Sequence, residues 1–124
     1  MDRYQHWIDG RRTAPIAGQY LPTLDPMTTA PWAELARGDA ADVDAAVGAA
    51  QRAFAGWRVA GPTRRAEVIW RLGDLIAEHA DELAALEARD AGKVVREVRG
   101  QMVSLSAWYH YYASLAYQTE GRTI

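Results

Sequence analysis

Apolar residues recur every three or four positions over residues 63–93, the segment around which the chain is organised. The apolar set is Ile69, Leu72, Ile76, Ala80, Leu83 and Leu86. Steps of three and four bring these side chains onto one face of an α-helix, which predicts an amphipathic helix with water on its opposite face. Thr63 is expected to cap the start of this helix and Gly92 to end it, because glycine accepts the left-handed conformation that follows many helices.

A helix over this whole segment would be long for a chain of this size. A continuous helix over residues 63–89 would extend roughly 40 Å at about 1.5 Å per residue, whereas a compact domain of this chain length has a radius of gyration of about 14 Å. The helix is therefore expected either to break near residues 79–81, with Asp81 capping a second part, or to run along the whole body. Trp70 lies on the polar side of the stripe, where its ring is expected to lie half-exposed over neighbouring side chains or to contact a partner.

Alternating and turn-forming residues before this segment predict a small β region. The expected strands cover residues 4–8, 11–13, 19–24 and 32–36. Asp9 and Gly10 are expected to form the turn of a β-hairpin between the first two strands, since both residue types tolerate a positive φ.

Two further helices are expected, one on either side of the central segment. Asp39 is expected to cap the first, in which Asp42 would interact with the helix dipole. The apolar stripe of that helix is Val43, Val47, Ala50, Phe54 and Trp57. Helical spacing from Val95 to Tyr117 predicts the other helix, with Gly121 at its end. An extended segment at residues 122–124 would follow, and a chain that stops as a strand begins is expected to be part of a larger fold.

The composition is that of a globular domain. The chain has 124 residues, of which 49% are hydrophobic and 24% charged, enough for a real core. A net charge of −2 gives no electrostatic reason to expect nucleic acid or an anionic membrane as a partner. The absence of cysteine excludes disulfides, zinc–thiolate sites and thiol catalysis by this chain. Since the sequence shows no secretion segment and no apolar run of about 20 residues, a soluble cytoplasmic protein is expected.

Few patterns in the sequence indicate catalysis. It has no G-x-G phosphate loop and no G-x-S-x-G nucleophile elbow, and its three histidines are not spaced as metal ligands. Ser104 and Ser106 are expected to be ordinary helix residues, and Lys93 a charge at a helix end. The aromatic run over residues 108–112 is expected to pack in the core on one side and against another segment on the other. Asp90 has two interpretations: a helix-end residue that bonds local backbone, or a functional carboxylate.

Several segments, in one order over the whole length, resemble the amino-terminal quarter of the aldehyde dehydrogenase superfamily. They are Tyr4 to Gly10, Leu21 to Pro26, Gly38 to Val47 with Ala53, Phe54 and Trp57, Glu87 to Lys93, and Tyr111 to Ala113 with Gly121 to Ile124. The most recognisable is Glu87-x-x-Asp90-x-Gly92-Lys93. The resemblance implies an α/β fragment in which short strands and a hairpin precede three amphipathic helices, as part of the family's cofactor-binding domain. Residues 1–124 would be the incomplete amino-terminal portion of that domain.

The resemblance also implies an activity, a cofactor and partners. Family members oxidise an aldehyde to a carboxylic acid with NAD or NADP, through a cysteine nucleophile and a glutamate that activates water. Those residues lie beyond the matched region, so this chain alone is expected to be inactive and to bind no cofactor. Its expected partners are the rest of the aldehyde dehydrogenase fold or further copies in a homo-oligomer.

A candidate metal site follows from the same resemblance. In many family members a monovalent cation lies near the position that matches Asp90. Backbone oxygens near Thr23 and Leu24 complete that site. The three residues are therefore the candidate cation ligands of this chain.

A second interpretation belongs to a different class of function. The chain would be a stand-alone, mainly helical interaction module derived from that fold, without catalysis. Such a module is expected to unfold cooperatively and to form a defined dimer. A piece of an enzyme is instead expected to fold poorly alone, because three helical stripes lack a full sheet to cover and expose apolar surface.

Overall fold

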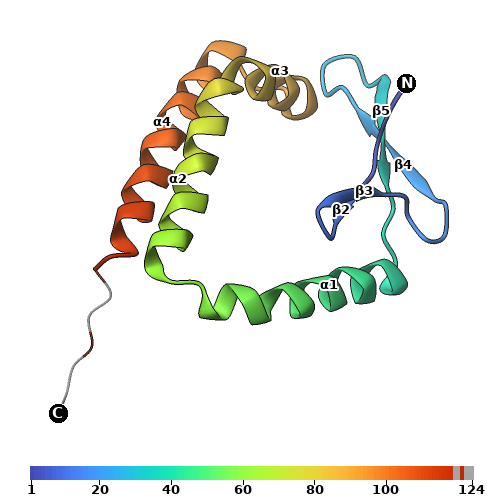
Figure 1. Ribbon diagram of the computed structural model, residues 1–124. Coiled ribbons are helices and arrows are strands. Elements are labelled where there is room, and N and C mark those ends of the chain that lie inside the picture. The colour runs from blue at the N-terminus through green and yellow to red at the C-terminus, as the bar shows by residue number, and fades with distance from the viewer. Residues whose placement is uncertain (119–120, 122–124) are drawn as a thin grey trace. The chain divides into compact units, whose positions relative to one another are not determined.

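Five short strands precede four helices in the computed structural model, which describes residues 1–118 and residue 121. The elements are β1 (Asp2–Tyr4), β2 (His6–Ile8), β3 (Arg11–Thr13), β4 (Tyr20–Leu24), β5 (Pro31–Ala36), α1 (Ala40–Val59), α2 (Pro62–Glu78), α3 (Ala80–Ala91) and α4 (Val95–Leu115) (Figure 1). This order confirms an α/β fragment with its strands at the amino terminus. The chain divides into two compact units, Met1–Val59 and Ala60–Ile124, and each is described by itself.

The first unit contains a three-stranded sheet and a separate hairpin. In the sheet, β5 lies between β1, to which it is parallel, and β4, to which it is antiparallel. The register between β4 and β5 shifts between Thr23 and Leu24, which marks a bulge or irregularity in the pairing. In the hairpin, β2 and β3 flank a turn in which Asp9 and Gly10 have φ values of 56° and 73°. These positive values confirm the predicted two-residue turn.

Helix α1 begins with the predicted cap. The Asp39 carboxylate accepts the backbone N–H groups of Ala41 at 2.8 Å and of Asp42 at 3.3 Å. Asp42 and Ala49 are the buried residues of this helix. The predicted stripe is instead exposed, with values between 42% and 59% for Val43, Val47, Phe54 and Trp57. The apolar periodicity therefore located the helix correctly, but its stripe is a surface in this structure and not a core.

The central helical segment breaks at His79, which confirms one of the two predicted alternatives. Helix α2 ends at Glu78 and α3 begins at Ala80, while His79 between them has φ −104° and ψ 17°. The three expected helical segments are therefore four helices. Gly92 follows α3 with a φ of 68° and donates its N–H to the Ala88 carbonyl at 2.9 Å, as predicted for a helix end.

The predictions that Thr63 caps α2 and that Asp81 caps α3 are both wrong. Helix α2 begins at Pro62, one residue before Thr63, and no side chain caps it. Proline suits this first position because its φ is already helical and it has no N–H to satisfy. Asp81 lies inside the first turn of α3 and forms an exposed ion pair with Arg99 of α4, and its carboxylate does not cap the helix.

Small residues form the contact between α2 and α4, which lie side by side in the second unit (Figure 1). The buried residues on the two helices are Ala66, Gly73, Val98, Ser106 and Ala113. A Cβ atom added to Gly73 would lie 2.8 Å from the His110 ring and 3.1 Å from the Ser106 carbonyl oxygen. The helices therefore approach closely at this point, while Leu72 and Leu86 of the predicted stripe remain 39% and 37% exposed.

The last helix is slightly shorter than predicted. Helix α4 spans Val95–Leu115, whereas the sequence pattern predicted an end at Tyr117. The extended segment predicted at residues 122–124 lies outside the described residues. Over the part of the chain that the structure describes, no helix is both long and apolar enough to cross a membrane.

Candidate functional site

A buried carboxylate organises the first unit. Asp42 is 4% exposed and accepts the N–H of Ile16 at 2.9 Å on one oxygen and the N–H of Asp39 at 3.0 Å on the other. Since Asp39 accepts the N–H of Asp42 in return, the two residues cap the helix reciprocally. The bond to Ile16 also fastens the loop before β4 to the start of α1.

The surroundings of Asp42 favour its charged form. The backbone N–H of Asp39, and then that of Ile16, lower the pKa of Asp42 below its ordinary value, although burial opposes them. His6 lies beside it, with Nε2 at 3.8 Å from the Asp42 carboxylate. The His6 Nε2 atom is buried and has no hydrogen-bond partner among the described residues. This cluster connects β2, the loop at Ile16 and the start of α1, which is a structural role.

A second polar cluster joins α2 to α4. His110 Nε2 lies 3.0 Å from an Asp74 carboxylate oxygen, and the His110 ring stacks on Trp70 with centroids 4.3 Å apart and planes inclined by 14°. Trp70 is 47% exposed, which confirms the prediction of a half-exposed ring over neighbouring side chains. Gly73 leaves room for the His110 ring at this point. The cluster fixes the position of two aromatic rings at a helix–helix contact.

The residues of the expected cation site belong to different units. Thr23 and Leu24 are adjacent on β4, at the irregularity in its pairing with β5. Asp90 lies in the last turn of α3 and is exposed. Over residues 1–118 and residue 121, no three His, Asp or Glu side chains are grouped as metal ligands. A site made largely of backbone oxygens would not depend on such a group, so the cation site stays a prediction.

The other chemically interesting side chains have local partners. The Ser104 hydroxyl donates to the Gly100 carbonyl at 2.9 Å, and the Ser114 hydroxyl donates to the Tyr111 carbonyl at 2.6 Å. These bonds within α4 agree with the predicted role of Ser104 as a helix residue. Lys93 forms an ion pair with Glu87 just beyond the end of α3. These serine, lysine and glutamate side chains therefore interact within α4 and at the end of α3.

The start of α1 does not fit the pyrophosphate of a dinucleotide cofactor. A pyrophosphate needs free backbone N–H groups at a helix start that follows a strand, usually with glycines that allow close approach. The turn from β5 to α1 has this topology, but the Asp39 and Asp42 carboxylates already accept the N–H groups there. Their negative charges would also repel a phosphate. This helix start is therefore not a cofactor cradle.

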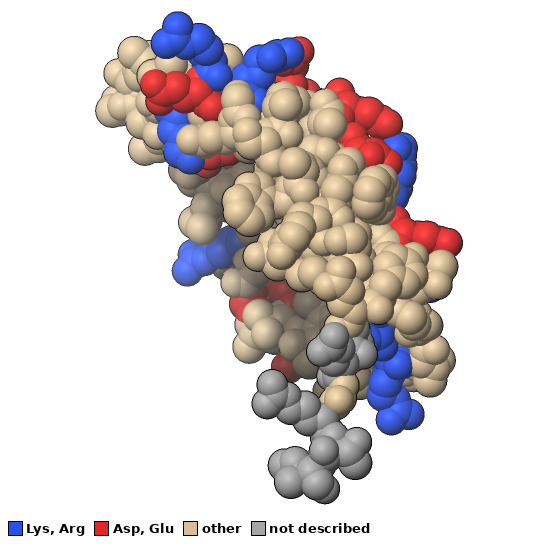
Figure 2. Space-filling view, turned by 90° about the vertical axis from the view of Figure 1, so that its left-hand side faces the viewer, with Lys and Arg blue, Asp and Glu red and all other residues tan. Residues whose placement is uncertain are grey.

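The outer face of α4 is a large uncharged surface. No Lys, Arg, Asp or Glu occurs between Gly100 and Leu115. Figure 2 shows a broad area of uncharged residues with charged residues along its edges. Trp108 stacks on Tyr112 at 6.4 Å, and Tyr112 contacts Tyr111 edge to face at 5.3 Å, with all three rings 56–59% exposed. Large exposed apolar patches are typical of sites that contact another protein segment, a membrane or a ligand.

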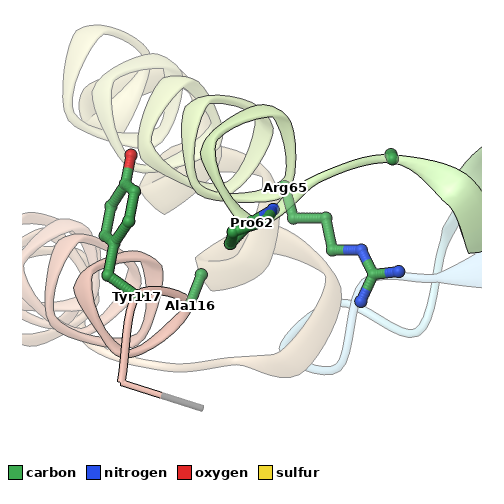
Figure 3. Close-up of a pocket in the computed structure, with 5 residues that line it drawn as sticks. Pro62, Arg65, Ala116 and Tyr117 are labelled. Atoms are coloured by element: carbon green, nitrogen blue, oxygen red, sulfur yellow. The ribbon is translucent and has the colours of Figure 1, made fainter.

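Hollows lie at both ends of α4. A hollow of about 670 Å³ near its start is lined by Glu97, Gly100, Gln101, Ser104, Leu105 and Trp108. Another, of about 460 Å³, lies between the start of α2 and the end of α4 and is lined by Ala60, Pro62, Arg65, Ala116 and Tyr117 (Figure 3). In the first hollow the Ser104 hydroxyl donates to the Gly100 carbonyl, and the lining of the second contains no serine and no carboxylate.

Comparison with known proteins places these features in a larger context. The pattern of the aldehyde dehydrogenase family matches residues 13–124. Hydroxyisobutyraldehyde dehydrogenase of Mycolicibacterium austroafricanum is 36% identical over 118 residues, which are 95% of this chain and 23% of that protein. The NADP/NAD-dependent aldehyde dehydrogenase PuuC of Escherichia coli (strain K12) is 41% identical over 92 residues, or 73% of this chain and 19% of that protein.

Solved structures agree with the sequence relatives. The crystal structure of HpcC from Thermus thermophilus matches 98% of this chain with a TM-score of 0.93 and 36% identity. The match covers 24% of the HpcC chain. This chain therefore spans about a quarter of the length of the curated relatives that it matches.

Proposed function

Because the chain belongs to the aldehyde dehydrogenase family, we propose that residues 1–124 form an amino-terminal segment of an enzyme that oxidises an aldehyde to a carboxylic acid with NAD or NADP. The observation that carries this proposal is the match of nearly the whole chain to one quarter of its relatives. The name of PuuC, an NADP/NAD-dependent aldehyde dehydrogenase, supports the cofactor class. Under this proposal the nucleophile, the water-activating group and the cofactor cradle belong to other parts of the enzyme.

The exposed apolar faces support a role within a larger fold. The outer face of α4 and the stripe of α1 are surfaces that a globular enzyme would cover. At about 25 cal/mol per Å², their burial would contribute substantially to folding. We propose that the remaining part of an aldehyde dehydrogenase fold, or further copies in a homo-oligomer, covers them.

The test begins with the size of the protein in the cells that make it. An intact mass several-fold above 13.7 kDa would identify residues 1–124 as the start of a full enzyme. That enzyme is expected to reduce NAD or NADP only when an aldehyde is present. If the mass is 13.7 kDa, the short chain is to be co-expressed with the missing three quarters of a relative, and aldehyde-dependent reduction is to be measured with and without it.

Two outcomes would contradict the proposal. One is aldehyde-dependent reduction by the 124-residue chain alone, since it has no cysteine to attack the aldehyde. The other is a short chain that unfolds cooperatively, forms a defined dimer and restores no activity to the missing part. That second result would favour the stand-alone interaction module.

We also propose that Thr23, Leu24 and Asp90 contribute to a site for a monovalent cation. K⁺ or Na⁺ is expected to raise the thermal unfolding midpoint of the protein slightly, and Asp90→Ala is expected to abolish this gain. Asp44→Ala is the matched control, because Asp44 is another exposed carboxylate on a helix. Unfolding is to be followed by circular dichroism at several KCl concentrations. If the thermal midpoints of the two variants depended equally on salt, the effect would come from general screening and the proposal would be wrong.

A further inference from the structure

A small hollow with two aromatic walls lies on the second unit. Its volume is about 300 Å³, at the lower end of the range of ligand sites, and its lining is Ala66, Glu67, Trp70, Ala113, Ser114 and Tyr117. Ala66 and Ala113 are 5% and 2% exposed, so they form its floor at the contact between α2 and α4. The Trp70 and Tyr117 side chains are 47% and 62% exposed, so much of each ring remains open to a ligand.

The Trp70 wall is held in place before any ligand arrives. His110 stacks on one face of the indole at 4.3 Å, and Asp74 holds the His110 ring through a 3.0 Å contact with Nε2. Gly73 permits this arrangement, since a side chain there would meet the His110 ring. An anchored ring loses little conformational entropy when it binds a ligand, which favours binding.

Tyr117 provides the second wall. Its ring rises from the end of α4 beside the first turns of α2, while the Arg65 side chain extends in another direction (Figure 3). Arg65 lines a neighbouring hollow and not this one. The Tyr117 ring is therefore not covered by that cation.

The charge of the lining selects the kind of ligand. Glu67 is the one ionisable carboxylate among the six lining residues, and none of them is positively charged. The Ser114 hydroxyl uses its proton on the Tyr111 carbonyl at 2.6 Å, so it presents lone pairs to other groups. Aromatic faces attract cations through the negative face of the ring quadrupole. Arg64 competes for Glu67, because its guanidinium lies 3.4 Å from the Glu67 carboxylate, but this ion pair is exposed and of the kind that contributes little.

We propose that this hollow, which we call the Trp70–Tyr117 hollow, binds small organic ammonium ions. The apolar body of the ion lies on the alanine floor, its charge lies between the two rings, and Glu67 balances the charge at the rim. The site does not depend on the proposed enzyme activity, because the chemistry proposed above uses none of its lining residues.

Tetramethylammonium and tert-butanol are suitable probes, because they are similar in shape and differ in charge. Binding to the full chain is to be followed by NMR from the shift of the probe methyl protons. Tetramethylammonium is expected to bind about tenfold more tightly than tert-butanol, as cation–π attraction between two rings predicts. Nuclear Overhauser contacts are expected from its methyl groups to the Trp70 and Tyr117 rings.

Matched variants separate the contributions of individual side chains to tetramethylammonium binding. Tyr117→Leu is expected to weaken tetramethylammonium binding about fivefold, whereas Tyr111→Leu, which removes an exposed ring outside the hollow, is expected to leave it unchanged. Glu67→Gln is expected to weaken binding about two- to fivefold. Arg64→Gln is expected to strengthen it by about twofold, because the internal competitor for Glu67 is lost.

Three results would each overturn the proposal. Equal affinity for tert-butanol and tetramethylammonium would show an apolar hollow without cation selection. Methyl contacts to other rings would place the ion elsewhere. Equal binding by the Tyr117→Leu and Tyr111→Leu variants, with circular dichroism spectra like that of the parent protein, would exclude Tyr117 as a wall.

Discussion

Gly73→Ala is expected to lower the free energy of unfolding by about 1–2 kcal/mol, although alanine is the better helix former. The new Cβ would lie 2.8 Å from the His110 ring and 3.1 Å from the Ser106 carbonyl oxygen. The ring cannot simply move aside, because it contacts Asp74 and stacks on Trp70. The carbonyl belongs to the backbone of α4, so the two helices must separate.

Gly100→Ala is the matched control for this prediction. Gly100 is also inside a helix of the second unit, but a Cβ there would meet no atom within 4 Å. This variant is expected to raise the free energy of unfolding by about 0.5–1 kcal/mol, because alanine loses less backbone entropy than glycine. Urea unfolding followed by circular dichroism measures both variants. If both substitutions changed stability with the same sign, the close approach of α2 to α4 would not be the cause.

Asp42→Asn is expected to produce the second large loss of stability, in the first unit. The carboxylate accepts the N–H groups of Ile16 and Asp39 with its two oxygens, at 2.9 and 3.0 Å. An amide of the same size would direct its own NH₂ group at one of these donors. One buried N–H would then lose its partner, and the loop at Ile16 would lose its tie to α1.

The dependence of this loss on pH has a definite sign. The pKa of Asp42 in the folded protein lies below the value of about 3.9 for an unfolded aspartate, chiefly because the Asp39 N–H bonds its charged form. The contribution to stability is therefore fully present above that unfolded value. It is lost as the pH falls through the folded-state pKa. The difference between the parent protein and the Asp42→Asn variant is expected to be largest near neutral pH and to shrink in acid.

Asp44→Asn tests whether any lost charge on α1 has the same effect. Asp44 is exposed on the same helix, so its replacement is expected to change the thermal midpoint little. Thermal unfolding from pH 7 down to pH 2, followed by circular dichroism, gives the comparison. A constant difference between parent and Asp42→Asn across this range would mean that the ionised carboxylate is not the stabilising group.

Local chemistry explains which parts of the fold the sequence predicted. The turn at Asp9 and Gly10, the cap at Asp39 and the helix end at Gly92 each depend on the backbone preference of one or two residues. Helix length left two alternatives open, and the break at His79 is one of them. The family resemblance was confirmed, because it rested on many short segments in one order.

Contacts between elements explain what sequence reasoning missed. The sequence pattern predicted an apolar stripe on the central helix, but α2 meets α4 through Ala66, Gly73 and Ser106, whose small size permits close packing. Ala66 and Gly73 are seven residues apart, and this spacing of small residues was a signal in the sequence. A search for apolar residues alone overlooked it. Asp42 was interpreted through the helix dipole alone, although Asp39-x-x-Asp42 has the spacing of a reciprocal cap.

The candidate sites also divide into features that local sequence indicated and features that depend on contacts between elements. The Trp70–Tyr117 hollow depends on two helices meeting end to start, which periodicity within one helix does not reveal. The cation residues Thr23, Leu24 and Asp90 came from family resemblance, and they stay a prediction. The half-exposed position of Trp70 did follow from its place outside the apolar stripe.

The pairing of β1 with β5 has a consequence for the order of events during synthesis. The two strands join Asp2 to Ala33 and Tyr4 to Leu35, and the hydrogen bond from Ile16 to Asp42 joins the loop to α1, so these interactions all lie within residues 2–42. Ribosomes add about 5–20 residues per second, and amino-terminal units generally fold first. The residues of the sheet and of the start of α1 are therefore synthesised before those of α4, which begins at Val95, and their pairing needs none of its residues.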